Sequence, residues 1–259
     1  MAMRLRDRVA IVTGGGSGLG RAGALAMARE GATVLVADLA EPSARETAAL
    51  ITGAGGAARA CAADVGNPRD AERMIGEAVS VFGALHILYN NAGIALPFED
   101  GFTLRVEPEV WDKVIRVNLS SVFYCSKYAI PEIAKAGGGA IINTASSMAH
   151  LPLGGLDGYA ASKGGVAMLT KSMAVGCGKM NIRVNAISPG YVDTPMNALI
   201  WGNEDIKRGF ERGHMMGLQT VEEIADLVVF LASDEARSLT GAVINCDRGW
   251  TAFKQPEMG

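Results

Sequence analysis

Short apolar, β-branched segments alternate with longer segments of helical spacing, and this alternation constrains the fold more than any other feature of the chain. The apolar segments predict strands over Val9–Thr13, Thr33–Ala37, Ala58–Ala62, Ile87–Tyr89, Ala140–Asn143, Arg183–Ile187 and Val243–Asn245. The intervening segments predict helices over Leu19–Glu30, Pro42–Thr52, Asn67–Phe82, Pro108–Ala136, Gly158–Met180 and Val221–Ser233. Continuous apolar strands are typical of a parallel sheet covered on both faces, with right-handed crossovers between strands. The sequence therefore predicts a doubly wound α/β fold of about seven strands with helices on both faces.

Residues 1–259 are interpreted as a single domain. The chain shows no break in composition, and its 49% of hydrophobic residues can fill one core of α/β size. Residues 194–217 interrupt the alternation between a strand and the last helix, and they are rich in Met, Trp and Gly. We interpret this segment as a substrate lid. Residues 250–259 are predicted to form a C-terminal tail that exposes Trp250 and Phe253 to a partner subunit.

Charge and cysteine content exclude several classes of partner. The net charge of −3 comes from mixed signs, without the basic stripe that nucleic acid or an anionic membrane requires. The four cysteines have neither CxxC spacing nor the density of a disulfide scaffold, which predicts reduced thiols. Residues 1–8 lack the apolar region of a signal peptide, and the longest uncharged run, 136–156, is too polar to span a bilayer. We therefore expect a cytoplasmic protein without metal, nucleic-acid or membrane partners.

A glycine-rich run over residues 14–20 follows the first predicted strand, which ends at Thr13, and opens the first predicted helix. Glycines at such a turn let the backbone approach a phosphate, and the helix N-terminus supplies N–H groups and a favourable dipole. Ser17 adds a hydroxyl donor. The GxGxxG match that starts at Gly18 begins five residues after the strand, too late for its first glycine to make the turn. A tight turn without any ligand is the alternative interpretation.

Thr13-Gly14 followed by Gly18-Leu19-Gly20 forms a TGxxxGxG pattern that resembles the short-chain dehydrogenase/reductase family. The resemblance extends from Val9 to Gly249 and implies a Rossmann fold. Further motifs follow in the family's order: Asp64-Val65, Asn90-Asn91-Ala92-Gly93, and Ser188-Pro189-Gly190 with Val192 and Thr194. The cofactor-binding residues that the resemblance implies are Gly14, Ser17, Gly18, Leu19, Gly20, Asp38, Asp64, Val65, Asn91, Gly93, Tyr159, Lys163, Pro189, Gly190, Val192 and Thr194.

The identity of the cofactor is predicted from Asp38, which follows the second predicted strand, 18 residues after Gly20. An acidic side chain there can accept hydrogen bonds from both adenosine ribose hydroxyls of NAD, and it would repel the 2′-phosphate of NADP. Gly15, Gly16 and Leu39 stand where NADP-using members of the family often carry a basic residue. The sequence therefore predicts NAD, with a merely solvated Asp38 as the alternative.

Tyr159 and Lys163 stand four residues apart at the start of a predicted helix, so both side chains project from one face. A neighbouring ammonium and an oxidised nicotinamide favour the phenolate of a tyrosine, whose free pKa is about 10. Ser146 lies 13 residues before Tyr159, and the resemblance implies that it orients the substrate oxygen. The family uses the residue at Asn118 for a proton-relay water, whereas a solvated helix kink is the alternative there.

The resemblance thus implies an NAD-dependent dehydrogenase that transfers a hydride between NAD(H) and a secondary alcohol or ketone, with Tyr159 as general acid/base. A 3-oxoacyl-[acyl-carrier-protein] reductase is one alternative, but it normally prefers NADPH and needs a basic patch. An enoyl reductase would carry its lysine seven residues after the tyrosine, where this chain has Val166. A catalytically silent dinucleotide-binding module would keep the fold without the chemistry, and the complete catalytic set disfavours it.

Family members commonly form tetramers through two long helices and the C-terminal edge, so we expect a homotetramer through 108–136, 158–180 and the tail. The chain departs from the family at Gly176 and Gly178, which puts the continuity of one helix in doubt, and at Arg248, which replaces a glycine.

The small-molecule alcohol or ketone is expected to bind in a mostly apolar pocket. Its predicted walls are the segment after Ser146 and the lid, with His150, Leu151, Leu153, Leu156, Met196, Ile200 and Trp201. His150 is interpreted as a solvated loop residue rather than a catalytic one.

Overall fold

Seven strands form one parallel sheet in the computed structural model of the chain, which describes residues 3–252 and, at Leu199 and Ile200, the backbone alone. The strands are β1 (Val9–Thr13), β2 (Thr33–Asp38), β3 (Ala57–Ala62), β4 (Ile87–Asn90), β5 (Gly139–Thr144), β6 (Ile182–Pro189) and β7 (Val243–Cys246). Their order across the sheet is β3-β2-β1-β4-β5-β6-β7. All seven predicted strands are confirmed, each within two residues of its predicted ends.

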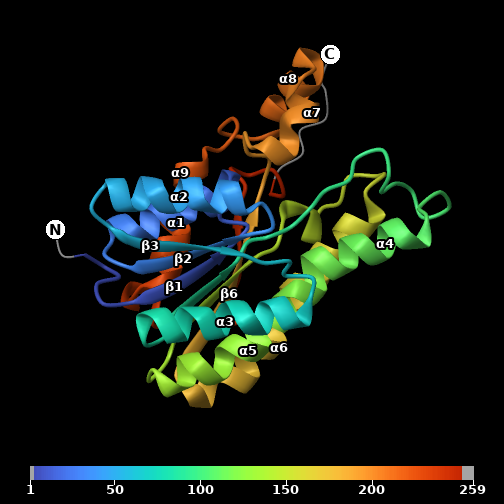
Figure 1. The fold of residues 1–259 in the computed structure, drawn as a ribbon. Coiled ribbons are helices and arrows are strands. Elements are labelled where there is room, and N and C mark those ends of the chain that lie inside the picture. Colours follow the sequence, from blue (N-terminus) through green and yellow to red (C-terminus); the bar gives the residue numbers. More distant parts are fainter. Residues whose placement is uncertain (1–2, 253–259) are drawn as a thin grey trace.

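Helices cover both faces of this sheet. They are α1 (Gly18–Arg29), α2 (Glu41–Gly53), α3 (Pro68–Phe82), α4 (Pro108–Ile115), α5 (Ser121–Lys135), α6 (Asp157–Cys177), α7 (Ala198–Trp201), α8 (Glu204–Gly213) and α9 (Val221–Ala232). Figure 1 shows α1, α2 and α9 on one face and α3, α5 and α6 on the other, while α7 and α8 stand out from the body. The predicted doubly wound α/β fold is therefore confirmed.

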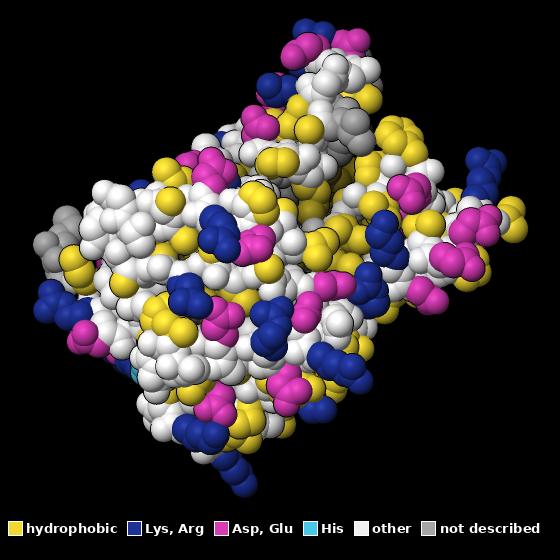
Figure 2. All heavy atoms as spheres, viewed as in Figure 1, with side chains coloured by type: hydrophobic (Ala, Val, Ile, Leu, Met, Phe, Trp, Pro, Cys, Tyr) yellow, Lys and Arg dark blue, Asp and Glu magenta, His cyan; other side chains and the backbone are white. Residues whose placement is uncertain are grey.

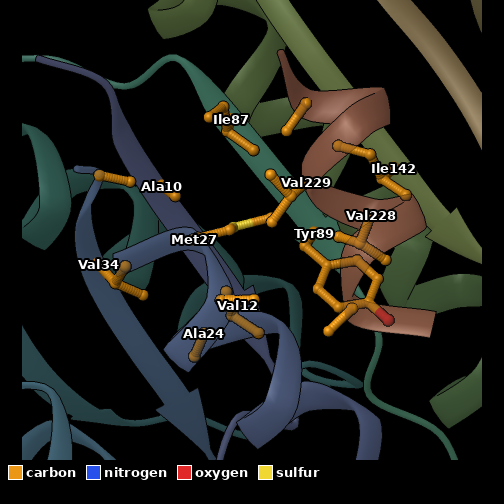
Figure 3. Close-up of a cluster of buried hydrophobic side chains, with 14 of the residues drawn as sticks. Ala10, Val12, Ala24, Met27, Val34, Ile87, Tyr89, Ile142, Val228 and Val229 are labelled. Carbon is orange, nitrogen blue, oxygen red and sulfur yellow. The ribbon is translucent and has the colours of Figure 1, made fainter. Parts of the chain in front are cut away.

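The core on one face lies between β1, β4 and the pair α1 and α9. In Figure 3, Met27 of α1 and Val229 of α9 point toward each other, and Ile87 of β4 belongs to the same cluster. Gly23 lets α1 approach the sheet closely, because a Cβ at this position would lie 2.8 Å from the ring of Tyr89. Met27 and Tyr89 are fully buried, so the apolar surface that they remove from water stabilises this packing.

The order of the strands reverses beside β1, which pairs with β2 on one side and with β4 on the other. The crossovers on the two sides of this point run in opposite directions. They leave a crevice outside the carboxyl ends of the strands, where open α/β sheets bind their ligands. Thr13, Asp38 and Asn90, which end β1, β2 and β4, all lie at this edge.

The two long predicted helices are less regular than expected. The helix predicted over 108–136 contains a π-helical turn, η1 (Arg116–Ser120), between α4 and α5. The helix predicted over 158–180 continues through Gly176, so the doubt about continuity at that residue is wrong. The α-helix ends at Cys177, and Gly178 begins a 3₁₀ turn, η3 (Gly178–Met180).

Residues 194–217, interpreted as a lid, contain η4 (Pro195–Asn197), α7 and α8. The side chain of Ile200, predicted to bound the pocket, lies outside the described residues, as do Phe253 and the rest of the tail from residue 253. Within residues 3–252, no helix combines the length and apolar character needed to cross a membrane, and no group of three His, Cys, Asp or Glu is arranged to hold a metal ion.

Candidate active site

A pocket of about 490 Å³ opens at the carboxyl edge of the sheet. Its walls come from the glycine-rich turn, the ends of β2 to β5, the start of α6 and the segment after β6. Figure 2 shows it as a hollow with many hydrophobic side chains between the α7–α8 segment and the arm that carries α4. Apart from Gly20, which packs beneath the turn, every residue predicted to bind the cofactor lines this pocket.

The glycine-rich turn brings its backbone close to the following helix. Gly14 and Gly18 adopt φ angles of +63° and +50°, which favour glycine. A Cβ at Gly20 would lie 2.0 Å from the carbonyl oxygen of Gly14, so any side chain there would displace the turn. Ser17 is the N-cap of α1, and among residues 3–252 its side chain caps no backbone N–H. The turn therefore presents N–H groups and a free hydroxyl, which suit a pyrophosphate.

Asp38 is held in place at the end of β2 by two backbone donors. Gly16 N–H donates to Oδ2 and Ala40 N–H donates to Oδ1, each over 2.9 Å. The carboxylate is only partly buried and lines the pocket. Each oxygen keeps a lone pair for a further donor, so the position suits the two hydroxyls of a ribose.

Asp64 and Asn91 help to shape the loops after β3 and β4. Asp64 accepts from Gly66 N–H over 2.9 Å and pairs with Arg116 at 3.1 Å, which ties the loop after β3 to η1. Asn91 donates to the carbonyl oxygens of Thr13 and Gly14. These amide contacts fix the spacing between β1 and β4, so part of the role of Asn91 is structural.

Val65 and Gly93, in the loops after β3 and β4, also line the pocket. Val65 is buried beside the pocket. A Cβ at Gly93 would lie 3.4 Å from Lys163 Nζ and 3.2 Å from Asn118 Oδ1, which places Gly93 next to the predicted catalytic groups. Leu19, at the start of α1, also lines the pocket.

The segment after β6 crosses the pocket toward the glycine turn. Pro189, Gly190, Val192 and Thr194 all line the cavity, as predicted. Asn197 Nδ2 donates to the carbonyl of Val192 over 2.8 Å and holds the segment in its turn. A Cβ at Gly18 would lie 3.5 Å from the Thr194 side chain, so this segment and the phosphate turn bound the same space.

Tyr159 and Lys163 lie together in the first turns of α6, with Lys163 Nζ 5.7 Å from the centroid of the Tyr159 ring. Lys163 Nζ donates to the carbonyl oxygen of Thr144 over 2.7 Å. Burial lowers the pKa of Lys163 to about 8. Burial also raises the pKa of the Tyr159 phenol, while the nearby hydroxyl of Ser146 acts in the opposite direction. A cation or a hydrogen-bond donor beside Tyr159 therefore favours its phenolate.

Ser146 follows β5 and caps the 3₁₀ turn η2 (Ser147–Ala149), where its Oγ accepts from Met148 N–H over 3.1 Å. This contact leaves the O–H proton free to donate toward the pocket. Ser147 is buried and is the N-terminal residue of the same turn. His150 was expected to be solvated, and its side chain is exposed, but its Nε2 also lies 3.1 Å from Ser188 Oγ.

Asn118 lies inside the π turn and is fully buried. Its Oδ1 accepts from Ile94 N–H over 2.7 Å, and its Nδ2 donates to the carbonyl of Ile94 and to Ser162 Oγ. The amide is therefore satisfied by protein rather than by solvent. Both Nδ2 protons are used, so an ordered water there would have to bind to the remaining lone pairs or to the backbone.

Asp100 is a site residue that sequence reasoning missed. It is buried, and its two carboxylate oxygens accept from Gly158 N–H (2.9 Å) and Tyr159 N–H (2.7 Å). These donors belong to the first turn of α6, where backbone N–H groups lack helical partners. Asp100 thus anchors the amino-terminal end of the helix that carries Tyr159, and its distance in sequence from Tyr159 left no local signal.

We predict that Asp100→Ala lowers the free energy of unfolding by about 1–3 kcal/mol, because it leaves two buried N–H groups without their charged acceptor. For a chain of this size the melting temperature should fall by about 2–10 °C. Thermal unfolding of Asp100→Ala measures the fall in melting temperature, and Asp193→Ala, which removes an exposed carboxylate, is the control. Equal melting temperatures for both variants would show that Asp100 does not hold the helix.

A cluster of aromatic rings connects the α7–α8 segment to the end of the chain. The Trp250 ring stacks on Phe210 of α8, with centroids 5.7 Å apart, and also packs on His214. The prediction that Trp250 is exposed in the tail is therefore wrong. Arg248, at φ +45°, donates to the carbonyls of Met216 and Leu218 and pairs with Glu223. Its guanidinium fixes the end of the segment to the loop after β7.

The buried ammonium of Lys163 predicts a dependence of stability on pH. Its pKa is about 8 in the folded protein and 10.5 when exposed, so the cost of burying the charge is present below pH 8 and is lost as pH rises to 10.5. We predict that the free energy of unfolding of wild type rises by about 3 kcal/mol relative to that of Lys163→Met between neutral pH and pH 10.5.

Urea unfolding of the cofactor-free proteins at several pH values measures this difference, with Lys171→Met, exposed on the same helix, as the control. A difference between Lys163→Met and wild type that does not change with pH would contradict the burial of a charged ammonium.

Comparisons with known proteins point to one family. A family model described as enoyl-(acyl carrier protein) reductase matches residues 14–251. A cyclohexanol dehydrogenase of Acinetobacter sp. strain SE19 is 40% identical, over 97% of this chain and 98% of that protein. A cis-4-hydroxycyclohexanecarboxylate dehydrogenase of Sinomonas cyclohexanicum is 38% identical, over 97% and 100%. A crystal structure described as a short-chain alcohol dehydrogenase from Sinorhizobium meliloti 1021 superposes with a TM-score of 0.93, at 34% identity, over 98% and 100% of the two chains.

Proposed function

The chain belongs to the short-chain dehydrogenase/reductase family, and we propose that it oxidises a secondary alcohol on a six-membered ring, with NAD as its cofactor. As a member of this family it is an oxidoreductase that acts on CH–OH groups and uses a nicotinamide dinucleotide. The observation that carries the proposal is the convergence of Tyr159, Lys163 and Ser146 at one end of the pocket. The activities named for the two relatives support a ring alcohol.

The proposed proton transfer centres on the Tyr159 phenol. In the oxidative direction Tyr159, as the phenolate, accepts the proton of the substrate hydroxyl, and in the reductive direction it returns that proton. Lys163, 5.7 Å from the ring, stabilises the phenolate. The Ser146 hydroxyl donates to the substrate oxygen and stabilises charge that develops there. When bound, the nicotinamide ring supplies the hydride acceptor.

NAD rather than NADP is proposed because of Asp38. Its carboxylate lies at the end of β2, beside the glycine turn, where it would face the adenosine ribose. The residues of the turn fit a dinucleotide, since Gly14 and Gly18 have the positive φ angles that glycine favours and the turn leads into the N-terminus of α1, whose N–H groups suit a pyrophosphate. Lys163 would also hold the nicotinamide ribose, and Asn118 is kept as the proposed proton-relay residue.

The alternatives have less support. An enoyl reductase, the activity in the description of the family model, would place a lysine at Val166, which is buried in a small apolar cluster away from the pocket. A 3-oxoacyl-[acyl-carrier-protein] reductase would need NADPH beside Asp38 and a basic surface for its carrier. A silent module would have no use for the grouping of Tyr159, Lys163 and Ser146.

Residues 194–217 are proposed to act as the substrate lid. Met196, Asn197 and Phe210 of this segment line the pocket, and the Arg248 contacts fix its carboxyl-terminal end. Asn197 holds the start of the segment, and the packing of Phe210 on Tyr191 and Trp250 holds α8. Between these contacts, α7 can change its distance from α4 while the sheet stays fixed. Closure would exclude water from the reacting groups.

The homotetramer and the cytoplasmic location also remain proposals. Exposed apolar side chains on the paired helices support the first: Trp111 on α4, Phe123 on α5, and Met168 and Val175 on α6. Such a surface is typical of a subunit interface. Four free cysteines support a reducing compartment.

The first test measures reduction of NAD or NADP by the purified protein with cyclohexanol, an acyclic secondary alcohol and a polyol. We expect turnover of cyclohexanol with NAD, and a lower kcat/KM with NADP or with the acyclic alcohol. If the protein oxidised NADPH with a 3-oxoacyl thioester faster than it reduced NAD with any of the alcohols, the 3-oxoacyl-[acyl-carrier-protein] reductase alternative would replace the proposal. A rise in melting temperature with NAD, without turnover of any alcohol or ketone, would favour the silent module.

A further inference from the structure

Tyr191 lines the pocket directly after β6, in a position that sequence reasoning did not single out. Its ring centroid lies 4.1 Å from that of Phe210 and 5.1 Å from that of Trp250. Its N–H donates to His214 Nε2 over 3.3 Å, so the backbone at Tyr191 is fixed as well. The side chain is 8% exposed, and the surrounding rings fix its orientation.

The hydroxyl of Tyr191 is buried, and within residues 3–252 it has no hydrogen-bond partner. Three other side-chain atoms share this condition: Arg183 Nη1, Trp201 Nε1 and Trp250 Nε1. Of the four residues, only Tyr191 lines the pocket. A buried polar group without a partner is unfavourable, and natural proteins rarely keep one without a ligand or water to satisfy it.

Tyr191 and Tyr159 line the same pocket. Burial raises the pKa of Tyr191 above its usual value, and negative charge on Tyr159 raises it further. A ring substrate whose reacting oxygen lies at Tyr159 would have its other carbons in the pocket that Tyr191 also lines.

The three rings packed against Tyr191 belong to Phe210, His214 and Trp250. His214 Nδ1–H donates to the carbonyl of Phe210 over 2.6 Å, and its Nε2 accepts from Tyr191 N–H, so its ring is the neutral tautomer. Phe210 and Trp250 add no charge. A carboxylate bound beside these rings would lose its hydration without a cation to replace it, whereas a hydroxyl or a carbonyl would not carry this cost.

We propose that the Tyr191 hydroxyl binds a second, uncharged oxygen of the substrate, so that the preferred substrates are ring compounds with a hydroxyl or keto group besides the reacting alcohol. This inference rests on the proposed function and narrows its substrate class to cyclic diols and hydroxyketones. Hydrogen bonding to a substrate oxygen would satisfy the free phenol and orient the ring at the same time.

The test compares cyclohexanol with 1,2-, 1,3- and 1,4-cyclohexanediol and with 4-hydroxycyclohexanecarboxylate, using wild type, Tyr191→Phe and Tyr128→Phe. Tyr128 lies on α5 outside the pocket and controls for the loss of a tyrosine hydroxyl. We expect wild type to prefer at least one diol over cyclohexanol by about tenfold in kcat/KM. Tyr191→Phe should remove this preference, whereas Tyr128→Phe should keep it.

Three results would overturn the inference while leaving the proposed function intact. The first is a wild-type preference for cyclohexanol or the carboxylate over every diol. The second is a fall in kcat/KM of Tyr191→Phe by the same factor with all substrates. The third is a melting temperature of cofactor-free Tyr191→Phe that lies several degrees below that of wild type. The last would mean that the hydroxyl has a partner within the protein. Failure of wild type to oxidise any alcohol would instead overturn the proposed function, and this inference with it.

Discussion

Tyr159→Phe is expected to lower kcat/KM for alcohol oxidation by a factor of about 10²–10⁴, the largest effect of any single substitution considered. The variant keeps the ring, and with it the packing at the start of α6, but it removes the only proposed proton acceptor. Because Lys163 stays bound to the Thr144 carbonyl, the ammonium should not move to replace the phenol. Steady-state reduction of NAD by cyclohexanol measures the loss.

The control for this prediction is binding of the cofactor. Tyr159→Phe should still show a rise in melting temperature with NAD, because the glycine turn and Asp38 are unchanged. Tyr128→Phe should retain wild-type activity. If Tyr159→Phe kept activity within threefold of wild type, another group would have to transfer the proton, and the proposed role of Tyr159 would be wrong.

Asp38→Asn is expected to lower the ratio of kcat/KM with NAD to that with NADP by a factor of about 10²–10³, because close like charges cost several kcal/mol. The carboxylate of wild type would lie beside the 2′-phosphate of NADP, and asparagine removes that repulsion while keeping the shape of the side chain. One of the two backbone donors, Gly16 or Ala40, can still bind the amide oxygen.

The measurement is kcat/KM with each cofactor at a saturating alcohol concentration, with Asp226→Asn, exposed on α9, as the control. The repulsion between exposed charges is screened by salt, so the change in ratio should be larger at low ionic strength. An unchanged ratio in Asp38→Asn would show that the carboxylate is solvated rather than placed at the ribose.

The strands and the cofactor turn could be predicted from the sequence because their signals are local. Each strand is a continuous apolar run, and the turn is a single glycine-rich stretch with Gly14 and Gly20 at fixed spacing. Tyr159 and Lys163 were placed together for the same reason, since residues four apart share a helix face. The structure adds the 5.7 Å separation between their side chains.

Other parts of the site depend on contacts between distant segments and carried no such signal. Asp100 binds N–H groups 58 and 59 residues further along the chain. Trp250 was predicted to be exposed because it lies near the chain end, yet it packs on Phe210. Asn118 was recognised as awkward in a helix, but its contacts with Ile94 and the π turn could be seen only in the fold.

The π turn in the long helix makes the number of residues between α4 and α5 critical. α4 packs on α6, whereas α5 packs on α3, so the two halves use buried faces with different orientations. A π turn is an α-helix with one residue inserted. Deleting one residue from 116–120 would restore the regular helix, but it would rotate α4 by about 100° relative to α5. Val114 would then leave its buried position, so this segment tolerates no change in register.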